Sequence, residues 1–394
     1  MERKLGTVAM GVRTGIIQAG DDLAEIVVDS LIDAVEANKL ILNKNDVLGI
    51  TESILARAEG NYASIEQIGE DVRNKFEGPI GLLFPIFSRN RFAVILKGII
   101  KSGRKVYLQL SYPTDEVGNR LVDDELLIEK NLNPYTDSFD EAKFREYFGE
   151  NVAHRFTGVD YVKLYKEIGG DQIEILFSND PKYILKYTKD VLVANVHARK
   201  RTKENLKKAG ANVVLGLEDI LNKPVDGSGY NPEYGLLGSN LATKDSLKLF
   251  PRDSQIFVED VQKRIKEKTG VEIHVMVYGD GAFKDPAGQI WELADPVVSP
   301  GFTKGLEGTP NELKLKYIAD NELRGLSKEE ATNKMKEKIS HKEGNITKTD
   351  SSLGTTPRQL TDLLGSLCDL ISGSGDKGTP IILIQGYFDN FSTQ

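Results

Sequence analysis

Apolar and polar positions in the first part of the chain, from about residue 5 to 78, predict short buried segments around one amphipathic helix. Asp21 and Asp22 can serve the N-terminal turn of that helix. Its apolar stripe follows the spacing of one helix face: Leu23, Ile26, Val27, Leu31, Ile32 and Val35. A turn over 43–46 then leads into 47–51, which predicts a strand. Polar residues at 51–53 stand where that strand ends.

The middle of the chain, from about 80 to 228, predicts a separate α/β unit. It opens with a buried apolar segment over 79–85. Further on, strand 191–196, polar helix 202–208 and strand 211–215 have the spacing of a parallel strand–helix–strand pair. A stretch rich in Pro, Gly and Asn, over 222–231, predicts the linker out of this unit.

The last part, from about 232 to the end, combines two kinds of pattern. An amphipathic helix over 257–268 precedes an alternating strand over 271–277. Residues 314–341 are dense in Lys and Glu, which predicts solvated helices on the surface. A capping-box pattern at Thr356 begins a final apolar-striped helix, and the apolar run 381–384 predicts a buried strand.

Composition adds the class of protein. The 394 residues are 40% hydrophobic and 28% charged, as expected of a globular protein with two or three domains. The net charge of −8 argues against a general nucleic-acid binder. The one cysteine, Cys368, excludes a disulfide within the chain, and the four histidines are scattered without ligand spacing. With no signal peptide and no apolar run near 18 residues, we expect a cytoplasmic protein without a membrane span.

A loop of small residues over 372–380 is the first candidate site. Its members Gly373, Ser374, Gly375 and Gly378 would let backbone N–H groups approach an anion such as a nucleotide phosphate. A glycine-rich connection between a helix and a strand is also the ordinary way to end a helix. Both interpretations stay open on the sequence alone.

Three further segments could carry chemistry, each with an ordinary alternative. Asp280 lies between two glycines just after a strand, where it could bind Mg²⁺ or could form a common Asp-Gly turn. Ser239 and Asn240 suit ribose or phosphate contacts, or any tight loop. The basic run 197–208 could hold an acidic substrate, or could be a solvated helix face.

The order of these segments is more specific than any one of them. It resembles that of the γ-glutamyl ligases that extend the tail of the deazaflavin coenzyme F-420. The segments that match, in the family's order, are 12–23, 46–60, 235–240, 278–280 and 373–380. The resemblance covers roughly 8–75, 228–300 and 355–387.

This resemblance implies a mixed α/β (α+β) fold. A ligase-like core would be built from 1–79 and 229–394 around an inserted α/β domain over 80–228. It further implies an enzyme that uses GTP or ATP with Mg²⁺ or Mn²⁺. The enzyme would join an amino acid such as glutamate to an anionic small-molecule acceptor, and the chain would pair as a homodimer.

The resemblance also implies roles for particular residues. Asp280 would be catalytic and would bind metal together with Asp376. The nucleotide would be bound by Arg13, Glu52, Ser53, Arg57, Ser239, Asn240, Gly373, Ser374, Gly375, Asp376 and Gly378. Where the family has a further metal-binding Asp, this chain has Leu237 or Gly238. A catalytically inactive protein that binds a nucleotide or metabolite on the same fold is therefore the alternative.

Overall fold

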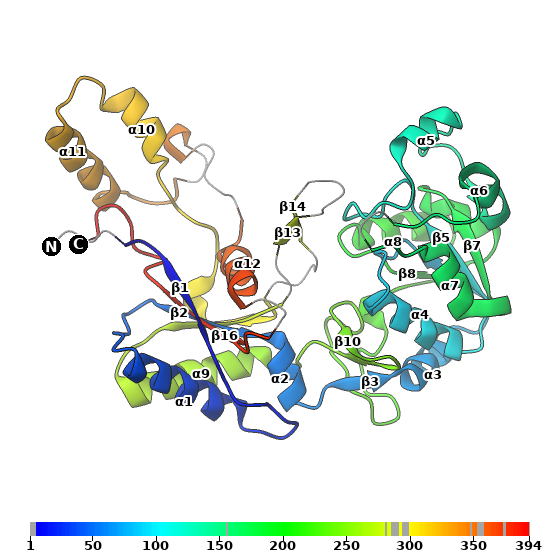
Figure 1. Ribbon diagram of the computed structural model, residues 1–394, viewed down its shortest axis with the longest axis horizontal. Helices are drawn as coiled ribbons and strands as arrows, with labels where there is room; N and C mark the ends of the chain where they lie inside the picture. Colours follow the sequence, from blue (N-terminus) through cyan, green and yellow to red (C-terminus); the bar gives the residue numbers. More distant parts are fainter. Residues whose placement is uncertain are drawn as a thin grey trace.

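Strands from both ends of the chain form one mixed sheet. The computed structural model describes residues 5–154, 157–279, 282–284, 291–293, 299–346, 349–352, 358–372 and 376–393. In sheet order the strands are β1 (Val8–Val12), β16 (Ile381–Gln385), β2 (Val47–Thr51), β12 (His274–Tyr278) and β15 (Gly301–Phe302). β2 and β12 are parallel, and β16 runs antiparallel to both of its neighbours, β1 and β2. The last strand thus lies inside the sheet, beside the first (Figure 1).

Helices cover both faces of this five-stranded sheet, because alternate residues of its buried strands point to opposite sides. Leu48 of β2 faces the layer formed by α1 (Leu23–Ala37) and α9 (Ser254–Thr269). Its neighbour Val47 faces α12 (Leu360–Ser372) on the other side. The runs at 47–50 and 381–384 are therefore free of polar side chains, as expected of strands buried on both faces.

The middle of the chain forms a second sheet, of six strands. In sheet order they are β6 (Phe139–Asp140), β7 (Ile173–Phe177), β5 (Val106–Leu110), β4 (Ile80–Leu83), β8 (Asp190–Val193) and β9 (Val213–Gly216). All are parallel except β6. The chain starts at β4, moves to one side through β5 and β7, and then returns to the other side for β8 and β9. This is a doubly wound sheet whose strand order reverses between β4 and β8.

Helices also cover both faces of the six-stranded sheet. On one face lie α3 (Ile65–Lys75), α4 (Arg91–Lys101), α6 (Glu141–Phe148) and α7 (Tyr161–Gly169). The other face packs against α8 (Arg199–Lys208). The predicted parallel strand–helix–strand pair is confirmed as β8, α8 and β9.

A small three-stranded sheet joins these two parts of the molecule. It contains β10 (Asn240–Thr243), β11 (Ser246–Lys248) and β3 (Tyr62–Ser64). Its residues Ala63 and Leu247 belong to the same apolar cluster as the six-stranded sheet, so that cluster extends past residues 79 and 229. The proposed domain limits therefore stay a prediction.

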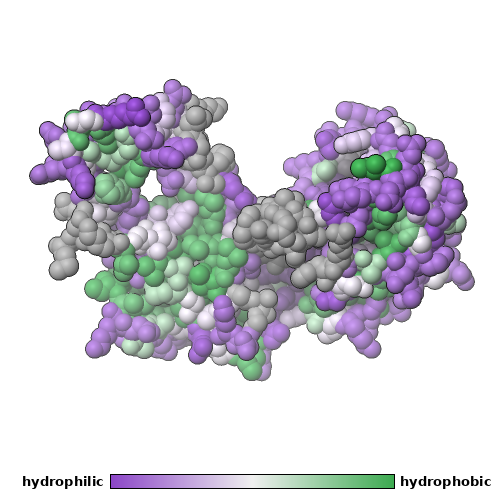
Figure 2. All heavy atoms as spheres, turned by 45° about the horizontal axis from the view of Figure 1, so that its top comes forward, coloured by the Kyte–Doolittle hydropathy of each residue, from purple (hydrophilic) through white to green (hydrophobic). Residues whose placement is uncertain are grey.

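Charged helices form an arm on the surface. α10 (Leu315–Glu322) and α11 (Lys328–Ser340) pack on each other through Ile318 and Met335. The arm shows mostly hydrophilic atoms in Figure 2, as predicted for solvated helices.

The expected mixed α+β fold is confirmed. The predicted helix cap at Thr356 lies outside the described residues, and α12 begins at Leu360. Within the described ranges, the chain has no helix of the length and apolar character needed to cross a membrane.

Candidate functional site

Four segments that are far apart in the sequence meet at one edge of the five-stranded sheet. Thr51 and Tyr278, the last residues of the parallel strands β2 and β12, are partners in the register. Because β16 is antiparallel to β1 and β2, its first residue, Ile381, pairs with residues near their carboxyl ends, Val12 and Ile50. The segments that follow β1, β2 and β12 therefore converge with the loop that precedes β16.

A pocket of about 640 Å³ lies at this edge, and we call it the edge pocket. Small-molecule sites commonly have volumes of about 300–1,000 Å³. The residues that line it are Thr14, Gly15, Ile16, Ile17, Thr51, Glu52, Ser53, Ile54, Arg57, Asn240, Leu241, Lys248, Tyr278, Gly279, Asp369, Ser372, Gly378, Thr379 and Pro380. The edge pocket thus brings together part of every segment that the resemblance singled out.

The carboxylate of Glu52 is fixed in the wall of the edge pocket. Thr51 caps α2 (Glu52–Ala58) by accepting the N–H of Ser53 at 3.4 Å, and its hydroxyl donates to Glu52 Oε2 at 3.1 Å. Glu52 Oε1 accepts from Asn240 Nδ2 at 2.7 Å. With only 5% of its surface exposed, Glu52 needs such partners, because a buried charge is costly without hydrogen bonds.

Positive charge stands beside this carboxylate. Lys248 of β11 donates from Nζ to the hydroxyl of Ser53. The exposed side chain of Arg57 leaves the same helix, α2, and also lines the pocket. An ammonium and a guanidinium near a small hydroxyl suit an oxyanion such as a phosphate.

Residues of α12 and of the end of β12 form another part of the wall of the edge pocket. Asp369 and Ser372, three positions apart on α12, share one side of that helix and line the pocket. Tyr278 is only 1% exposed, and burial raises the pKa of its phenol well above the ordinary value. The hydroxyl oxygen of Tyr278 is itself buried, and it therefore stays protonated.

Sequence reasoning gave no individual role to Lys248, Asp369, Ser372 or Tyr278. Ser372 begins the small-residue loop over 372–380, and Tyr278 begins the matched segment 278–280. Asp369 lies on the polar side of α12 just before that loop, which was the available signal. For Lys248 no local pattern marks the residue, and it reaches the pocket only because the sheets bring it there.

Three predicted residues lie elsewhere than in the wall of the edge pocket. Arg13 is exposed and donates from Nε to the carbonyl of Lys377 at 3.2 Å, which ties the end of β1 to the loop before β16. Ser239 is fully buried and donates its hydroxyl to the carbonyl of Leu236 at 2.8 Å. Asp376 is exposed and does not line the pocket. In contrast, Gly378 lines it with a φ of 65°, a conformation that favours glycine.

Asp280, Gly373, Ser374 and Gly375 lie outside the described residues. The residues directly before them, Gly279 and Ser372, both line the edge pocket. In the described part of the chain, no three His, Cys, Asp or Glu side chains gather as metal ligands. The metal assignments to Asp280 and Asp376 therefore stay predictions.

The position where the resemblance expects another Asp is apolar in its surroundings. Leu237 is 1% exposed and does not line the edge pocket. At Gly238, a Cβ atom would lie 1.8 Å from the ring of Phe250. Neither position can hold a carboxylate that faces the edge pocket without a change in the packing around it.

Comparison with known proteins gives the class and then the family. A pocket with both signs of charge, at the carboxyl ends of adjacent parallel strands, is typical of an enzyme for small charged substrates. The family described as F420-0:gamma-glutamyl ligase matches residues 11–386. The chain belongs to this family, so the resemblance drawn from the sequence is confirmed and the protein is a member of a ligase family.

The other comparisons add little. No curated protein matches the chain at a significant level. Among solved structures, the biosynthetic arginine decarboxylase from Campylobacter jejuni is 11% identical, with a TM-score of 0.15. That match covers 91% of this chain and 67% of the decarboxylase chain. A score this low carries no argument about fold or function.

Proposed function

We propose that this chain is a ligase that forms a γ-glutamyl-type amide on an anionic small-molecule acceptor, with GTP or ATP and a divalent metal. The observation that carries the proposal is the edge pocket, in which Lys248 and Arg57 stand beside the carboxylates of Glu52 and Asp369. Membership of the F420-0:gamma-glutamyl ligase family supports the reaction class. A site for a phosphate-bearing substrate and an amine needs both signs of charge.

The proposed reaction has two steps. The carboxylate of the acceptor attacks the γ-phosphoryl group of the nucleotide, and the nucleoside diphosphate leaves with the bond electrons. The amino nitrogen of glutamate then attacks the acyl phosphate, inorganic phosphate leaves, and the nitrogen loses a proton as the amide forms. A bound Mg²⁺ or Mn²⁺ supplies charge stabilisation at the phosphoryl oxygens.

The residues divide by charge in this proposal. Lys248, Arg57 and the hydroxyl of Ser53 hold the phosphates, and the amide of Asn240 contacts the nucleotide. The backbone N–H groups of 373–378 hold further phosphate oxygens. Asp280, which directly follows Gly279 of the pocket wall in the sequence, would bind the metal. Two copies of the chain form a homodimer.

Thermal unfolding with nucleotides is the first test. A ligand at about 100 times its Kd stabilises the folded chain by about 2.7 kcal/mol. We expect GTP or ATP to raise the Tm only when Mg²⁺ or Mn²⁺ is present, and we expect Asp280→Asn to abolish that metal dependence. Glutamate and F420-0 should then yield an amide product detectable by mass spectrometry. No Tm change with any nucleotide, or binding without turnover, would contradict the ligase assignment.

A further inference from the structure

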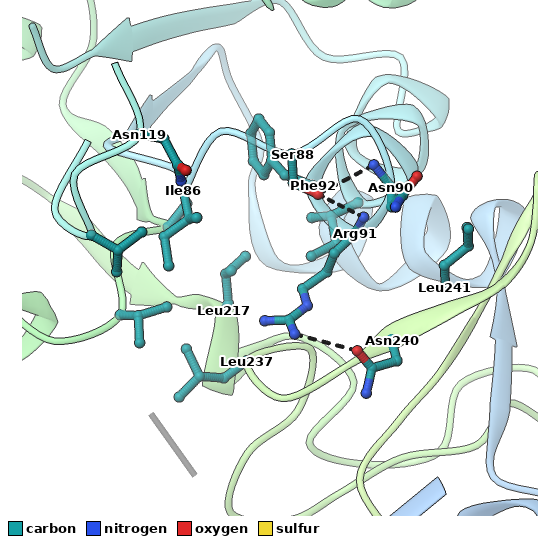
Figure 3. Close-up of a pocket in the computed structure, with 14 residues that line it drawn as sticks. Ile86, Ser88, Asn90, Arg91, Phe92, Asn119, Leu217, Leu237, Asn240 and Leu241 are labelled. Carbon is teal, nitrogen blue, oxygen red and sulfur yellow. Dashed lines mark hydrogen bonds between the residues drawn. The ribbon is translucent and has the colours of Figure 1, made fainter. Parts of the chain in front are cut away.

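Two pockets open at the carboxyl edge of the six-stranded sheet. One, of about 390 Å³, lies beside the start of α4, and its wall is mostly apolar (Figure 3). The other, of about 500 Å³, lies beside α8, and we call it the α8 pocket. Residues after β8 divide between the two, since Ala194 and Val196 line the first pocket and Asn195 lines the second. The α8 pocket has no lining residue in common with the edge pocket, so a ligand bound there occupies a separate site.

The α8 pocket lies where a doubly wound sheet binds its ligands. The order of the strands reverses between β4 and β8, and a crevice forms outside the carboxyl ends of the strands at that reversal. Phe84 directly follows β4, Ser111 directly follows β5, and both line the pocket. Phe84 has a φ of 54°, a strained conformation for a bulky residue, and such strain is concentrated at ligand sites. The volume is also that of a small-molecule site, about 300–1,000 Å³.

The basic run over 197–208, for which the sequence allows either a ligand site or a solvated helix face, is divided in the structure. Arg199 and Lys203 are engaged within the fold, the first with the carbonyl of Val196 at 2.6 Å and the second with the carboxylate of Asp219 at 2.7 Å. Arg201 lies between them and lines the α8 pocket. Among the described residues of the pocket wall, it carries the one positive charge.

The exposed guanidinium of Arg201 is free to bind a ligand. It forms no hydrogen bond or ion pair with any residue that the structure describes. Two carboxylates line the same pocket, but backbone N–H groups hold both of them. Asp115 accepts three such groups and the amide of Asn119, and Glu116 accepts the N–H groups of 196–198. An anionic group of a ligand is therefore the partner that Arg201 lacks.

Uncharged side chains define the rest of the ligand. Asn205 stands four positions after Arg201 on α8, so the two lie on one side of the helix, and both line the pocket. The hydroxyl of Thr114 is a further hydrogen-bonding group in the wall. Tyr135 also lines the pocket, although its side chain is 89% exposed, and Phe84 adds a second ring. An exposed aromatic ring of this kind suits the planar face of a base.

We propose that the α8 pocket binds a nucleoside monophosphate, with its phosphate on Arg201 and its base on Tyr135. The amide of Asn205 and the hydroxyl of Thr114 suit the ribose. The two carboxylates in the wall limit the anionic charge that the pocket can hold, which favours one phosphate over a triphosphate. This proposal does not rest on the ligase reaction, because it uses no residue of the edge pocket.

Isothermal titration calorimetry of the full chain with AMP, in the presence of EDTA, tests the site. EDTA removes the divalent metal on which the proposed reaction at the edge pocket depends. We expect saturable binding of AMP, and weaker binding of adenosine and of inorganic phosphate. Arg201→Met keeps the aliphatic stem and removes the charge, so it should weaken AMP binding about tenfold or more. Lys200→Met is the matched control, since Lys200 is the exposed neighbour that does not line the pocket, and its AMP affinity should equal that of the wild type.

A second pair of variants tests the space rather than the charge. Asn205→Trp fills the pocket from α8 and should remove AMP binding, whereas Glu204→Trp, at an exposed position outside the pocket, should not. Tyr135→Ala should lower the affinity for AMP and leave that for inorganic phosphate unchanged.

The outcomes separate this site from the edge pocket. An absence of AMP binding, or equal affinity in the wild type, Arg201→Met and Asn205→Trp, overturns the α8 pocket as a nucleotide site. Ribose 5-phosphate that binds as tightly as AMP overturns the role of Tyr135. Lys248→Met should leave AMP binding unchanged, and a loss in that variant would place AMP in the edge pocket and overturn the proposal. Failure of the ligase reaction changes none of these results, because the titration needs neither metal nor turnover.

Discussion

The Asn240 side chain links two helices that belong to different parts of the molecule, since it bonds to Glu52 of α2 and to Arg91 of α4. Its amide donates to the buried Glu52 carboxylate at 2.7 Å and accepts from Arg91 at 3.3 Å. Asn240→Ala removes both bonds and leaves Glu52 with one fewer donor. We expect this substitution to destabilise the protein and to weaken nucleotide binding at the same time.

The size of the effect follows from the two bonds. A hydrogen bond to a charged, buried group contributes about 1.5–3 kcal/mol, and the longer bond to Arg91 contributes less. The expected loss is therefore about 2 kcal/mol. For a cooperative unit of about 150–250 residues, this corresponds to a fall in Tm of about 4–8 °C.

Asn240→Asp tests the bond to Glu52 separately, because the side chain keeps nearly the same volume. The new carboxylate keeps an acceptor for Arg91 but has no N–H to donate to Glu52, so two carboxylates face each other where a hydrogen bond was. We expect Asn240→Asp to be less stable than the wild type.

Thermal unfolding is the assay, and Asn321→Ala is the matched control. Asn321 lies on the exposed face of α10 and donates to the carbonyl of Tyr317. Its replacement should change the free energy of unfolding by less than about 0.5 kcal/mol. If Asn240→Ala behaves like Asn321→Ala, or if Asn240→Asp is as stable as the wild type, the role given to this amide is refuted.

Three further predictions can be tested with single variants. Lys248→Met should weaken GTP binding at least tenfold by isothermal titration calorimetry, whereas Lys244→Met, in the exposed turn of the same hairpin, should not; equal affinities would contradict the phosphate role. Burial lowers the pKa of His274 below 6.5, so the unfolded chain binds this proton first and stability is lost as the pH falls below about 6.5. His274→Gln should lose less stability between pH 8 and pH 5 in thermal melts, and an equal loss would exclude His274 as the cause. Burial raises the pKa of the fully buried Cys368 thiol, so Ellman's reagent at pH 8 should detect it only after unfolding; rapid reaction of the native chain would show that α12 opens.

Much of the architecture could be predicted from the sequence because it depends on local periodicity. The apolar runs at 47–50 and 381–384 specify strands buried on both faces, and the stripe from Leu23 to Val35 specifies a helix that packs on one of these faces. The strand order could not be predicted in this way. Nothing in the residues of β16 indicates that it lies between β1 and β2, because that order depends on contacts more than 300 positions apart.

Part of the candidate site could likewise be predicted from the sequence, and part could not. The structure brings Glu52, Ser53, Arg57, Asn240 and Gly378 into one pocket, as their order in the sequence suggested, while their roles stay predictions. For Ser239, the sequence shows a hydroxyl but not its direction, which is toward the carbonyl of Leu236. The place of Lys248 and Asp369 in the pocket could not be predicted, because an isolated charge on a short strand or a helix is usually a solvated residue.

The position of β16 inside the five-stranded sheet determines when the edge pocket can form during synthesis. The strands of the six-stranded sheet are made within 80–216, so this part can assemble while the rest is still being translated. The five-stranded sheet forms later, because among the described strands β1 pairs with β16 alone, and β2 lacks one neighbour until Ile381–Gln385 leave the ribosome. Until then the ends of β1 and β2 are not held together. The edge pocket therefore cannot form in a nascent chain until translation has passed Gln385.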